Sequence, residues 1–412
     1  MTVIDTPTTV PSRPFGAPRV LAGISPDRAL TWTEHRAVHG VPALRPRAWL
    51  TDAMRAVNLL GRGGAAFPVA VKLEAMPFGG PMTVLVNGSE GEPASYKDRA
   101  LMTVAPHLVI DGALVVARAL GATAVTVAVH DSRAHASLAA ALDERPDADA
   151  ITVVHTRSGF VAGEIRAVVN GLNTGQARPG GRRDLPHDHG LAGRPTFASN
   201  VETFAQVAVL ARLGAAGYAA AGTRDEPGTS LVTLVGDVIQ AGVLEVANGT
   251  RLDALLPGRP GALVLVGGFH GTWVRSTAGL TVDRAALRAS GSPLGAGVIA
   301  RPHADTCVLA EVAVVSQWLA DQSAGQCGPC FFGLPALADD VRAFAAGRGS
   351  EAQVVRRAGQ VRGRGACAHP DGAVQFMSSA IVALADDIAV HRAHGTCGRP
   401  PSTIFPLPRS ES

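Results

Sequence analysis

A glycine-rich segment near the start of the chain has the composition of a turn that wraps an anion. It contains three glycines in four residues, Gly61-Arg62-Gly63-Gly64, and continues to Phe67. Glycine lets the backbone approach a ligand closely and adopt conformations that other residues disfavour, as a turn around a phosphate requires. The segment therefore predicts a phosphate cradle.

A second segment, residues 84–93, reads as a buried strand that runs into a polar and acidic loop. In an open α/β sheet, ligands bind at the carboxyl ends of the strands. The side chains that could contact a ligand there are Asn87, Ser89, Glu90 and Glu92.

The two segments match neither the dinucleotide-binding G-x-G-x-x-G motif nor the P-loop. A tight turn followed by a solvated acidic loop is therefore the alternative. Of the 37 basic residues only two are lysines, Lys72 and Lys97, and both lie within residues 61–99. Lysine is a compact point charge and arginine a planar fork, so the two are not interchangeable at a shaped site. This placement favours the phosphate cradle.

The cysteines form the second group with chemical potential. All five lie beyond residue 300, and an odd number so clustered favours a metal site over disulfides. Cys327 and Cys330 form a C-x-x-C pair, which alone fits a redox pair, a zinc half-site or an iron–sulfur half-site. Zinc would need two further ligands, for which Cys367, His369 and Cys397 are the candidates.

Cys307 lies where a polar turn leads into an apolar helix, and we interpret it as a small core residue. The 13 histidines are scattered and show no zinc-like spacing with the cysteines.

The elements that position these residues follow from hydrophobic patterning. Strands alternate with helices from about residue 81 to 213, which predicts a parallel sheet with helices on its faces. A β-β-α pattern with one further strand follows, and the chain beyond residue 305 reads as four helices of a small bundle. The expected strands are 83–86, 122–129, 151–155, 231–236, 242–246 and 263–268, and the expected helices are 106–120, 132–142, 308–320, 333–346, 352–361 and 374–393.

Composition limits the class of protein. With 412 residues, 47% hydrophobic and 17% charged, the chain can form several globular domains. A net charge of +3 gives no reason to expect nucleic-acid binding. We find no run of about 18 clean apolar residues and no secretory signal, so we expect a cytoplasmic protein without direct membrane insertion.

Part of the sequence resembles the flavin- and NADH-binding subunit of respiratory complex I. The resemblance lies in the glycine loop through Pro68, Lys72, the loop from Asn87 to Pro93 and the run 97–99. The relatives of that subunit in NAD-reducing hydrogenases and formate dehydrogenases share these features. The family carries GRGGAGFP, a downstream lysine, and N-x-x-E-x-E-P followed by K-D-R. Two later blocks agree in order, around Gly163-Glu164 and around Asn200.

The resemblance implies a Rossmann-like FMN-binding α/β domain, a small β-grasp (SLBB-type) domain and a C-terminal four-helix bundle. We expect an N-terminal arm (1–50), followed by domains at 51–225, 226–300 and 301–400 and a tail (401–412). The implied cofactor-binding residues are Gly61, Arg62, Gly63, Gly64, Phe67, Lys72, Asn87, Ser89, Glu90, Glu92, Phe160, Gly163, Glu164, Ser199 and Asn200.

The family also holds a [4Fe–4S] cluster on four cysteines. Cys327, Cys330 and Cys367 stand at three of these positions, and Ala324 occupies the first. A replacement ligand, a cluster with an open iron, a three-iron cluster and a vestigial motif are the alternatives, and Cys397 is the candidate replacement.

The implied function is electron transfer from NADH to FMN and then, one electron at a time, through an iron–sulfur cluster to a ferredoxin-like or other redox partner. The cofactors carry this chemistry, so we expect no catalytic side chain. The alternative is a non-catalytic scaffold subunit with a degenerate cluster site. Departures from the family pattern lie mainly near the dinucleotide: Ile165 for a glutamate, Phe160 for a tyrosine, Ser199 for an asparagine, Ala66 for a glycine and Ala75 for an aromatic residue.

Overall fold

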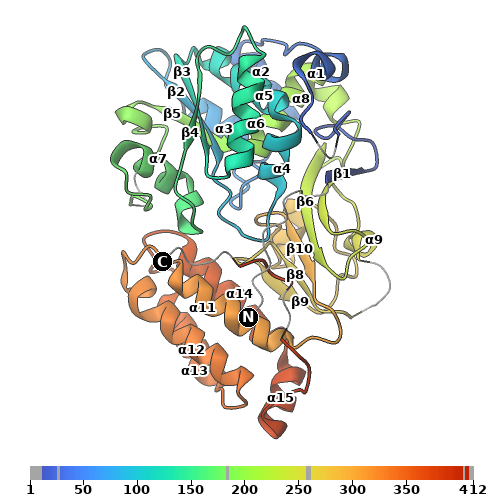
Figure 1. Cartoon of the computed structure of the whole chain (residues 1–412), viewed down its shortest axis with the longest axis vertical. Coiled ribbons are helices and arrows are strands. Elements are labelled where there is room, and N and C mark those ends of the chain that lie inside the picture. The colour runs from blue at the N-terminus through green and yellow to red at the C-terminus, as the bar shows by residue number, and fades with distance from the viewer. Residues whose placement is uncertain (1–11, 26–27, 182–184, 257–260, 402–403, 408–412) are drawn as a thin grey trace.

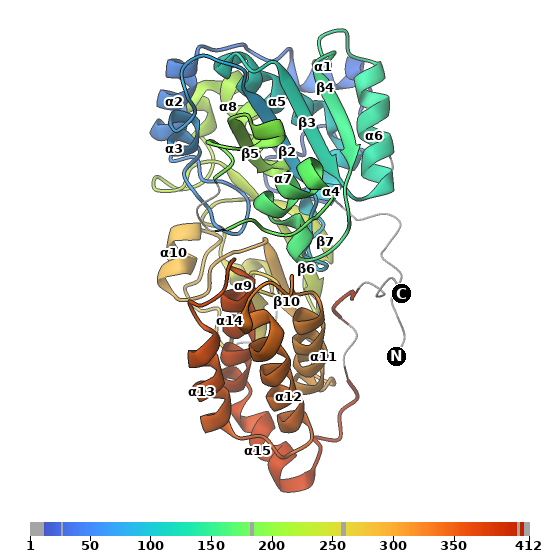
Figure 2. The ribbon, with the colours of Figure 1, turned by 90° about the vertical axis from the view of Figure 1, so that its left-hand side faces the viewer.

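A computed structural model describes residues 12–25, 28–181, 185–256, 261–401 and 404–407. The first eleven residues of the expected arm and most of the expected tail lie outside these ranges. An α/β region built on one sheet lies at one end of the molecule, a second sheet adjoins it, and helices form the other end (Figures 1 and 2).

The first sheet is entirely parallel, which confirms the expected α/β class. Its strand order is β4 (Ile151–His155), β3 (Ala124–Val129), β2 (Thr83–Gly88) and β5 (Thr196–Asn200). Asn87 of β2 is in register with Asn200 of β5. The polar loop that follows β2 and the start of α8 (Val201–Tyr218), which follows β5, therefore leave the same edge of the sheet side by side.

Helices cover both faces of this sheet. Pro106 opens α5 (Pro106–Leu120), whose span matches the expected helix and which is buried along most of its length. It packs against α8 (Val201–Tyr218) on one face, and α7 (Ile165–Thr174) covers the other (Figure 1). The remaining elements of this region are α2 (Arg47–Ala56), α3 (Val69–Glu74), α4 (Lys97–Val104), α6 (Ser132–Asp143) and the 3₁₀ turns η1 (Val161–Gly163) and η2 (Leu191–Gly193).

The second sheet has six strands in the order β1-β7-β6-β10-β8-β9. A β6–β7 hairpin matches the expected strands, and β10 lies parallel to β6 and antiparallel to β8. Strands β1, β9 and β10 and helix α10 were not predicted from the sequence. The bounds are β1 (Ser12–Phe15), β6 (Thr229–Gly236), β7 (Gly242–Ala247), β8 (Val264–Val266), β9 (Thr272–Val274), β10 (Val298–Arg301), α9 (Leu252–Leu255) and α10 (Arg284–Ala289).

The N-terminal arm is more ordered than its composition indicates. Its strand β1 pairs with β7, and α1 (Trp32–His39) starts at a capping box formed by Thr31 and Glu34. The buried carboxylate of Glu245 accepts hydrogen bonds from the backbone nitrogens of Arg19, Val20 and Leu21 at 2.9–3.0 Å. These contacts fix the arm to the second sheet.

The C-terminal region is helical, as expected, but its last expected helix, 374–393, is two helices that bend by 71°. Asp386 and Asp387 lie in the first turn after the bend, where carboxylates favour a helix N-terminus. The elements are α11 (Val308–Asp321), the π turn η3 (Pro329–Gly333), α12 (Leu334–Ala345), α13 (Glu351–Val361), α14 (His369–Ala383) and α15 (Ala385–His394).

In the described parts of the chain, no single helix has the length and apolar character needed to cross a bilayer. Two bent helix pairs, α4 with α5 and α14 with α15, reach that threshold only when each pair is taken together, by length and composition alone.

Candidate cofactor site

A cavity of about 300 Å³ lies at the carboxyl ends of β2 and β5, beside the glycine loop. Of the predicted cofactor residues, all but Phe160 line it. These are Gly61, Arg62, Gly63, Gly64, Phe67, Lys72, Asn87, Ser89, Glu90, Glu92, Gly163, Glu164, Ser199 and Asn200.

The glycine loop is closed at its base and open on its cavity side. Gly61 N donates to Phe67 O at 2.9 Å, and Arg62 N donates to the hydroxyl of Thr203 at 2.9 Å. A Cβ atom added to Gly63 or Gly64 would meet nothing within 4 Å. The loop therefore offers bare backbone to a ligand, which is the geometry that a phosphate cradle requires.

Ala66 shows why the related family has glycine at this point. Its φ of 48° lies in the left-handed region, which a side chain makes costly by about 1–2 kcal/mol. The loop thus keeps the turn geometry after the glycine has been replaced.

The polar loop after β2 packs directly on the turn before α7. The amide of Asn87 donates to Gly163 O at 2.8 Å. A Cβ atom on Gly163 would lie 2.3 Å from Ser89 O, so only glycine allows this approach. Glu164 caps α7 by accepting from the backbone nitrogens of Arg166 and Ala167 at 3.1 and 3.3 Å. These contacts fix the cavity wall.

The two lysines have different environments. Lys97 is ion-paired with Asp98 at 2.8 Å and with Glu202 at 3.4 Å. The ammonium of Lys72 donates to Ala198 O at 2.8 Å, and within the described residues it has no carboxylate partner. Burial lowers the pKa of Lys72 to about 8. Lys72 is therefore the cation of this cavity that an anionic ligand could neutralise.

Arg62 lines the cavity, but its guanidinium is directed into the protein. It contacts Glu226 at 3.3 Å and the hydroxyl of Ser230 at 3.0 Å, and Arg284 pairs with the same Glu226 at 2.7 Å. Arg62 thereby joins the glycine loop to the second sheet. Its side chain holds the loop in place and does not reach a ligand.

The two loop glutamates also bind backbone. Glu90 accepts from Asp98 N and Arg99 N at 3.3 and 3.1 Å. Glu92 accepts from Phe269 N at 2.8 Å, and burial raises its pKa to about 8. Each carboxylate therefore fixes a neighbouring segment at the edge of the cavity.

Phe160 does not line this cavity, unlike the other predicted cofactor-binding residues. Its ring packs against His270, with 4.6 Å between ring centroids, and against Trp318 at 5.4 Å, and its backbone nitrogen donates to Gln322. The ring is half-buried between the α/β region and the helices. Unlike the tyrosine of the family, phenylalanine has no hydroxyl that would favour a polar cavity.

Sequence reasoning also missed part of the cavity wall. Lys97 and Asp98 belong to the K-D-R run of the family, and Ile165 stands where the family has a glutamate. These three residues could therefore have been predicted from sequence features. Ala296 precedes β10 and carried no signal, since only the folded second sheet brings it here. The additional lining residues are Ala65, Ala66, Gly91, Ser95, Lys97, Asp98, Ile165 and Ala296.

Three of the cysteines converge near this cavity. Cys330 and Cys367 are buried, and Cys327 is partly exposed. Burial, together with the neighbouring thiols of Cys327 and Cys367, raises the pKa of Cys330 to about 12. A cationic cluster would relieve this penalty on the thiolates, so the donor set fits three-point attachment of an iron–sulfur cluster.

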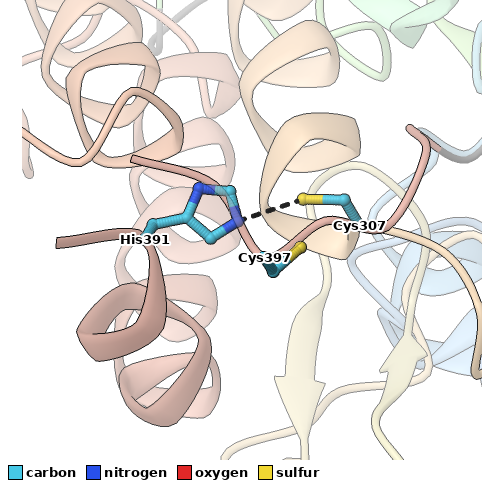
Figure 3. A group of neighbouring side chains, drawn as sticks. All are labelled: Cys307, His391 and Cys397. Atoms are coloured by element: carbon cyan, nitrogen blue, oxygen red, sulfur yellow. Dashed lines mark hydrogen bonds between the residues drawn. The ribbon is translucent and has the colours of Figure 1, made fainter. Parts of the chain in front are cut away.

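Cys397 is not part of this group. It lies with Cys307 and His391 at the start of α11 (Figure 3). Cys327 and Cys330 follow the end of that helix. A helix of 14 residues is about 21 Å long. The structure therefore contradicts the expectation that Cys397 replaces the ligand missing at Ala324.

His369 cannot complete a zinc site with the C-x-x-C pair. One ring nitrogen lies 3.0 Å from a nitrogen of His270, and the other lies 2.9 Å from Leu319 O. Both nitrogens are thus used within the protein.

Two family models match the chain. Residues 54–209 match the Nuo51 FMN-binding domain, and residues 310–391 match the NADH-ubiquinone oxidoreductase-F iron-sulfur binding region. Together these matches span more than half of the chain. The chain belongs to the family of NADH-quinone oxidoreductase F subunits.

Relatives within this family align along most of their length. An F subunit of the NADH-quinone oxidoreductase of Rhizobium meliloti is 28% identical over 84% of this chain and 90% of its own. The corresponding F subunit of Escherichia coli is 28% identical over 89% of this chain and 84% of its own.

Solved structures of an NAD⁺-reducing [NiFe]-hydrogenase share the fold. The air-oxidized state gives a TM-score of 0.77 at 26% identity and covers 91% of this chain. The H2-reduced state gives 0.73 at 25% identity and covers 86%. This chain spans 66% and 63% of those hydrogenase chains.

The open face of the glycine loop yields a first prediction. Gly63→Val should leave the apoprotein folded, because a Cβ atom there has no protein atom within 4 Å, yet it should abolish FMN binding by filling the cradle. Gly359→Val is the matched control, since a Cβ atom there is equally unhindered and lies on the exposed side of α13. FMN retained per folded chain decides the outcome, and full retention in Gly63→Val would place the cradle elsewhere.

The Arg62 ion pairs yield a second prediction. Arg62→Leu should lower the free energy of unfolding by about 3–5 kcal/mol, because it removes a cation that balances the buried carboxylates of Glu202 and Glu226 and leaves an excess of negative charge in the buried network. Arg251→Leu removes one member of an exposed pair and should change stability little. Urea denaturation of both apoproteins measures the difference; equal effects would show that the buried pair does not hold the loop.

A third prediction concerns Lys72 and pH. An anionic ligand favours the ammonium form, whereas the free protein loses that proton above pH 8 or so. FMN affinity should therefore fall by up to about tenfold per pH unit as pH rises through that value. In Lys72→Gln, binding should be about 10–100-fold weaker at pH 7 and should lose this pH dependence. Quenching of flavin fluorescence reports the affinity; an unchanged pH profile in the variant would exclude Lys72 from the site.

Proposed function

We propose that this chain oxidises NADH with a bound FMN and passes the electrons singly through an iron–sulfur cluster to a partner protein. One observation carries the proposal. The cavity combines a bare glycine loop with Lys72, a partly buried cation without a carboxylate partner among the described residues, beside a convergent set of cysteines. The family's FMN-binding and iron–sulfur regions coincide with these two features.

Bound FMN would supply the exchange between hydride transfer and single-electron transfer. The residues of the chain bind and orient the reactants. Lys72 would neutralise an anionic part of the ligand, and Gly63 and Gly64 would admit its phosphate to the backbone. The side chains of Glu90 and Glu92 hold neighbouring parts of the cavity wall through their backbone partners.

The cavity and the thiols are close enough to be coupled. Glu164 lines the cavity, and its carboxylate adds to the burial that raises the pKa of Cys367. The Phe160 turn, which leads into α7, packs on Trp318 and Gln322 at the end of α11. This contact supports a short path between a flavin in the cavity and a cluster on Cys327, Cys330 and Cys367.

We also propose that the second sheet is a β-grasp (SLBB-type) domain and that helices α11–α14 form a four-helix bundle. The parallel pairing of β6 with β10 between two antiparallel pairs supports the first assignment. The boundaries near residues 50, 225 and 300, a cytoplasmic location and a ferredoxin-like partner belong to the same proposal.

Flavin reduction by each nucleotide tests the proposal. In stopped-flow experiments, NADH should bleach the bound flavin of the wild-type chain. Ile165 lines the cavity where the family has a glutamate, so NADPH should be nearly as effective. Ile165→Glu should restore a preference for NADH of about tenfold or more, because a carboxylate repels the 2′-phosphate.

Two results would contradict this account. A flavin that neither nucleotide reduces would favour the scaffold alternative, and a strong NADH preference in the wild type would refute the role given to Ile165.

The missing cluster ligand yields a further prediction. Ala324→Cys should raise iron towards about four per chain after anaerobic reconstitution and slow cluster loss in air, because it completes a four-cysteine set. Cys397→Ser should leave iron unchanged, whereas Cys330→Ser should remove most of it. Iron and sulfide analysis measures all three variants. Loss of iron in Cys397→Ser comparable to that in Cys330→Ser would contradict the structure's placement of Cys397.

A further inference from the structure

A second group of potential metal ligands lies at the far end of α11 from the cysteine triad. Cys307 immediately precedes α11, His391 lies in the last turn of α15, and Cys397 follows that helix (Figure 3). Their ligand atoms all lie within 4.8 Å of one another. Cys307 and His391 are each only 3% exposed, and Cys397 is partly exposed. Three ligands from separate segments thus meet at one point.

His391 is oriented as metal-binding histidines usually are. Its Nδ1 lies 2.8 Å from Ala345 O, and since a carbonyl can only accept, Nδ1 carries the proton. Nε2 therefore presents its lone pair, and it lies 3.4 Å from the sulfur of Cys307. A backbone carbonyl that fixes the tautomer in this way is a common support for a metal-bound imidazole.

The spacing fits a tetrahedral ion. With zinc–sulfur and zinc–nitrogen bonds of about 2.3 and 2.0–2.1 Å, two ligands of a tetrahedron lie about 3.6 Å apart. The 3.4 Å between Cys307 Sγ and His391 Nε2 is close to that edge. Two thiolates and an imidazole suit zinc and not the hard cations that prefer oxygen.

We propose that Cys307, His391 and Cys397 bind a single zinc ion whose fourth position, on the side of the partly exposed Cys397, is open to water. This site goes beyond the proposed electron transfer and shares no residue with it.

The ion would fasten the C-terminal segment to the helical region. Cys307 N donates to Pro400 O at 2.6 Å, and Phe405 N donates to Glu311 at 3.2 Å. The ring of Phe405 packs on Phe269, in the turn between β8 and β9 of the second sheet, with 5.3 Å between ring centroids. An ion that joins Cys397 to Cys307, before α11, and to His391 of α15 would hold this segment where the second sheet and the helices meet.

Zinc content of the full chain tests the proposal. Protein purified anaerobically without chelators and dialysed against micromolar Zn²⁺ should hold about one zinc per chain by elemental analysis. X-ray absorption at the zinc edge should show two sulfur neighbours at about 2.3 Å and nitrogen or oxygen neighbours at about 2.0–2.1 Å. This signal is independent of iron and flavin.

Variants assign the ion to these residues. His391→Ala and Cys397→Ser should each reduce bound zinc to below about a tenth per chain, and neither should change the FMN content. His394→Ala, an exposed histidine on the same helix, should retain zinc. Cys330→Ser should lose iron and retain zinc, so failure of this proposal is distinguishable from failure of the proposed function.

Three results would overturn the inference. The first is a wild-type chain that takes up no zinc. This result includes a chain in which Cys307 and Cys397 form a disulfide, which lowers the intact mass by two hydrogens. The second is zinc that persists in His391→Ala. The third is a sulfur-only zinc shell that disappears in Cys330→Ser, since that ion would occupy the cluster cysteines.

Discussion

The buried ion pairs beneath the cavity hold its walls together. Arg62 from the glycine loop and Arg284 from the second sheet share the carboxylate of Glu226, and Lys97 pairs with Asp98 and Glu202. Buried ion pairs gain little net energy over apolar packing, but removing one partner is costly. The network therefore fixes which loops lie together more than it adds stability.

This network leaves one cation for a ligand. Three carboxylates balance Arg62, Lys97 and Arg284, so the field of these groups is largely neutralised within the protein. Lys72 stands apart, with a backbone carbonyl as its partner. An ammonium that lacks a carboxylate partner is stabilised when an anion enters the cavity. The structural charges and the ligand-binding charge are thus separate, although both lysines lie in one short stretch of sequence.

Features of the structure that depend on nearby residues in the sequence were predicted correctly. Residues 106–120 form a helix over the expected span, since a proline at its start and a mainly apolar run suffice to specify it. The chemical motifs likewise identified 14 of the 22 residues that line the cavity, because the carboxyl ends of parallel strands meet at one edge.

Features that depend on distant segments were missed. Strand β10 is four residues long and pairs with β6 far away in the sequence. Cys397 was the candidate replacement ligand because it lies near the chain end and was expected to be mobile, but the folded chain places it beside Cys307 and His391. Phe160 followed a family position, yet an apolar ring without a hydroxyl packs with Trp318 instead. Chain topology decided each case.

The central claim is that one chain holds a flavin in this cavity and a cluster on the adjacent cysteines. The most direct test is a visible spectrum of the anaerobically purified wild-type protein, with flavin, iron and sulfide counted on the same sample. The account predicts about one FMN together with the broad absorption of a cluster, and bleaching of both on addition of NADH. A colourless protein, or one that binds flavin with less than about one iron per chain after reconstitution, would contradict it.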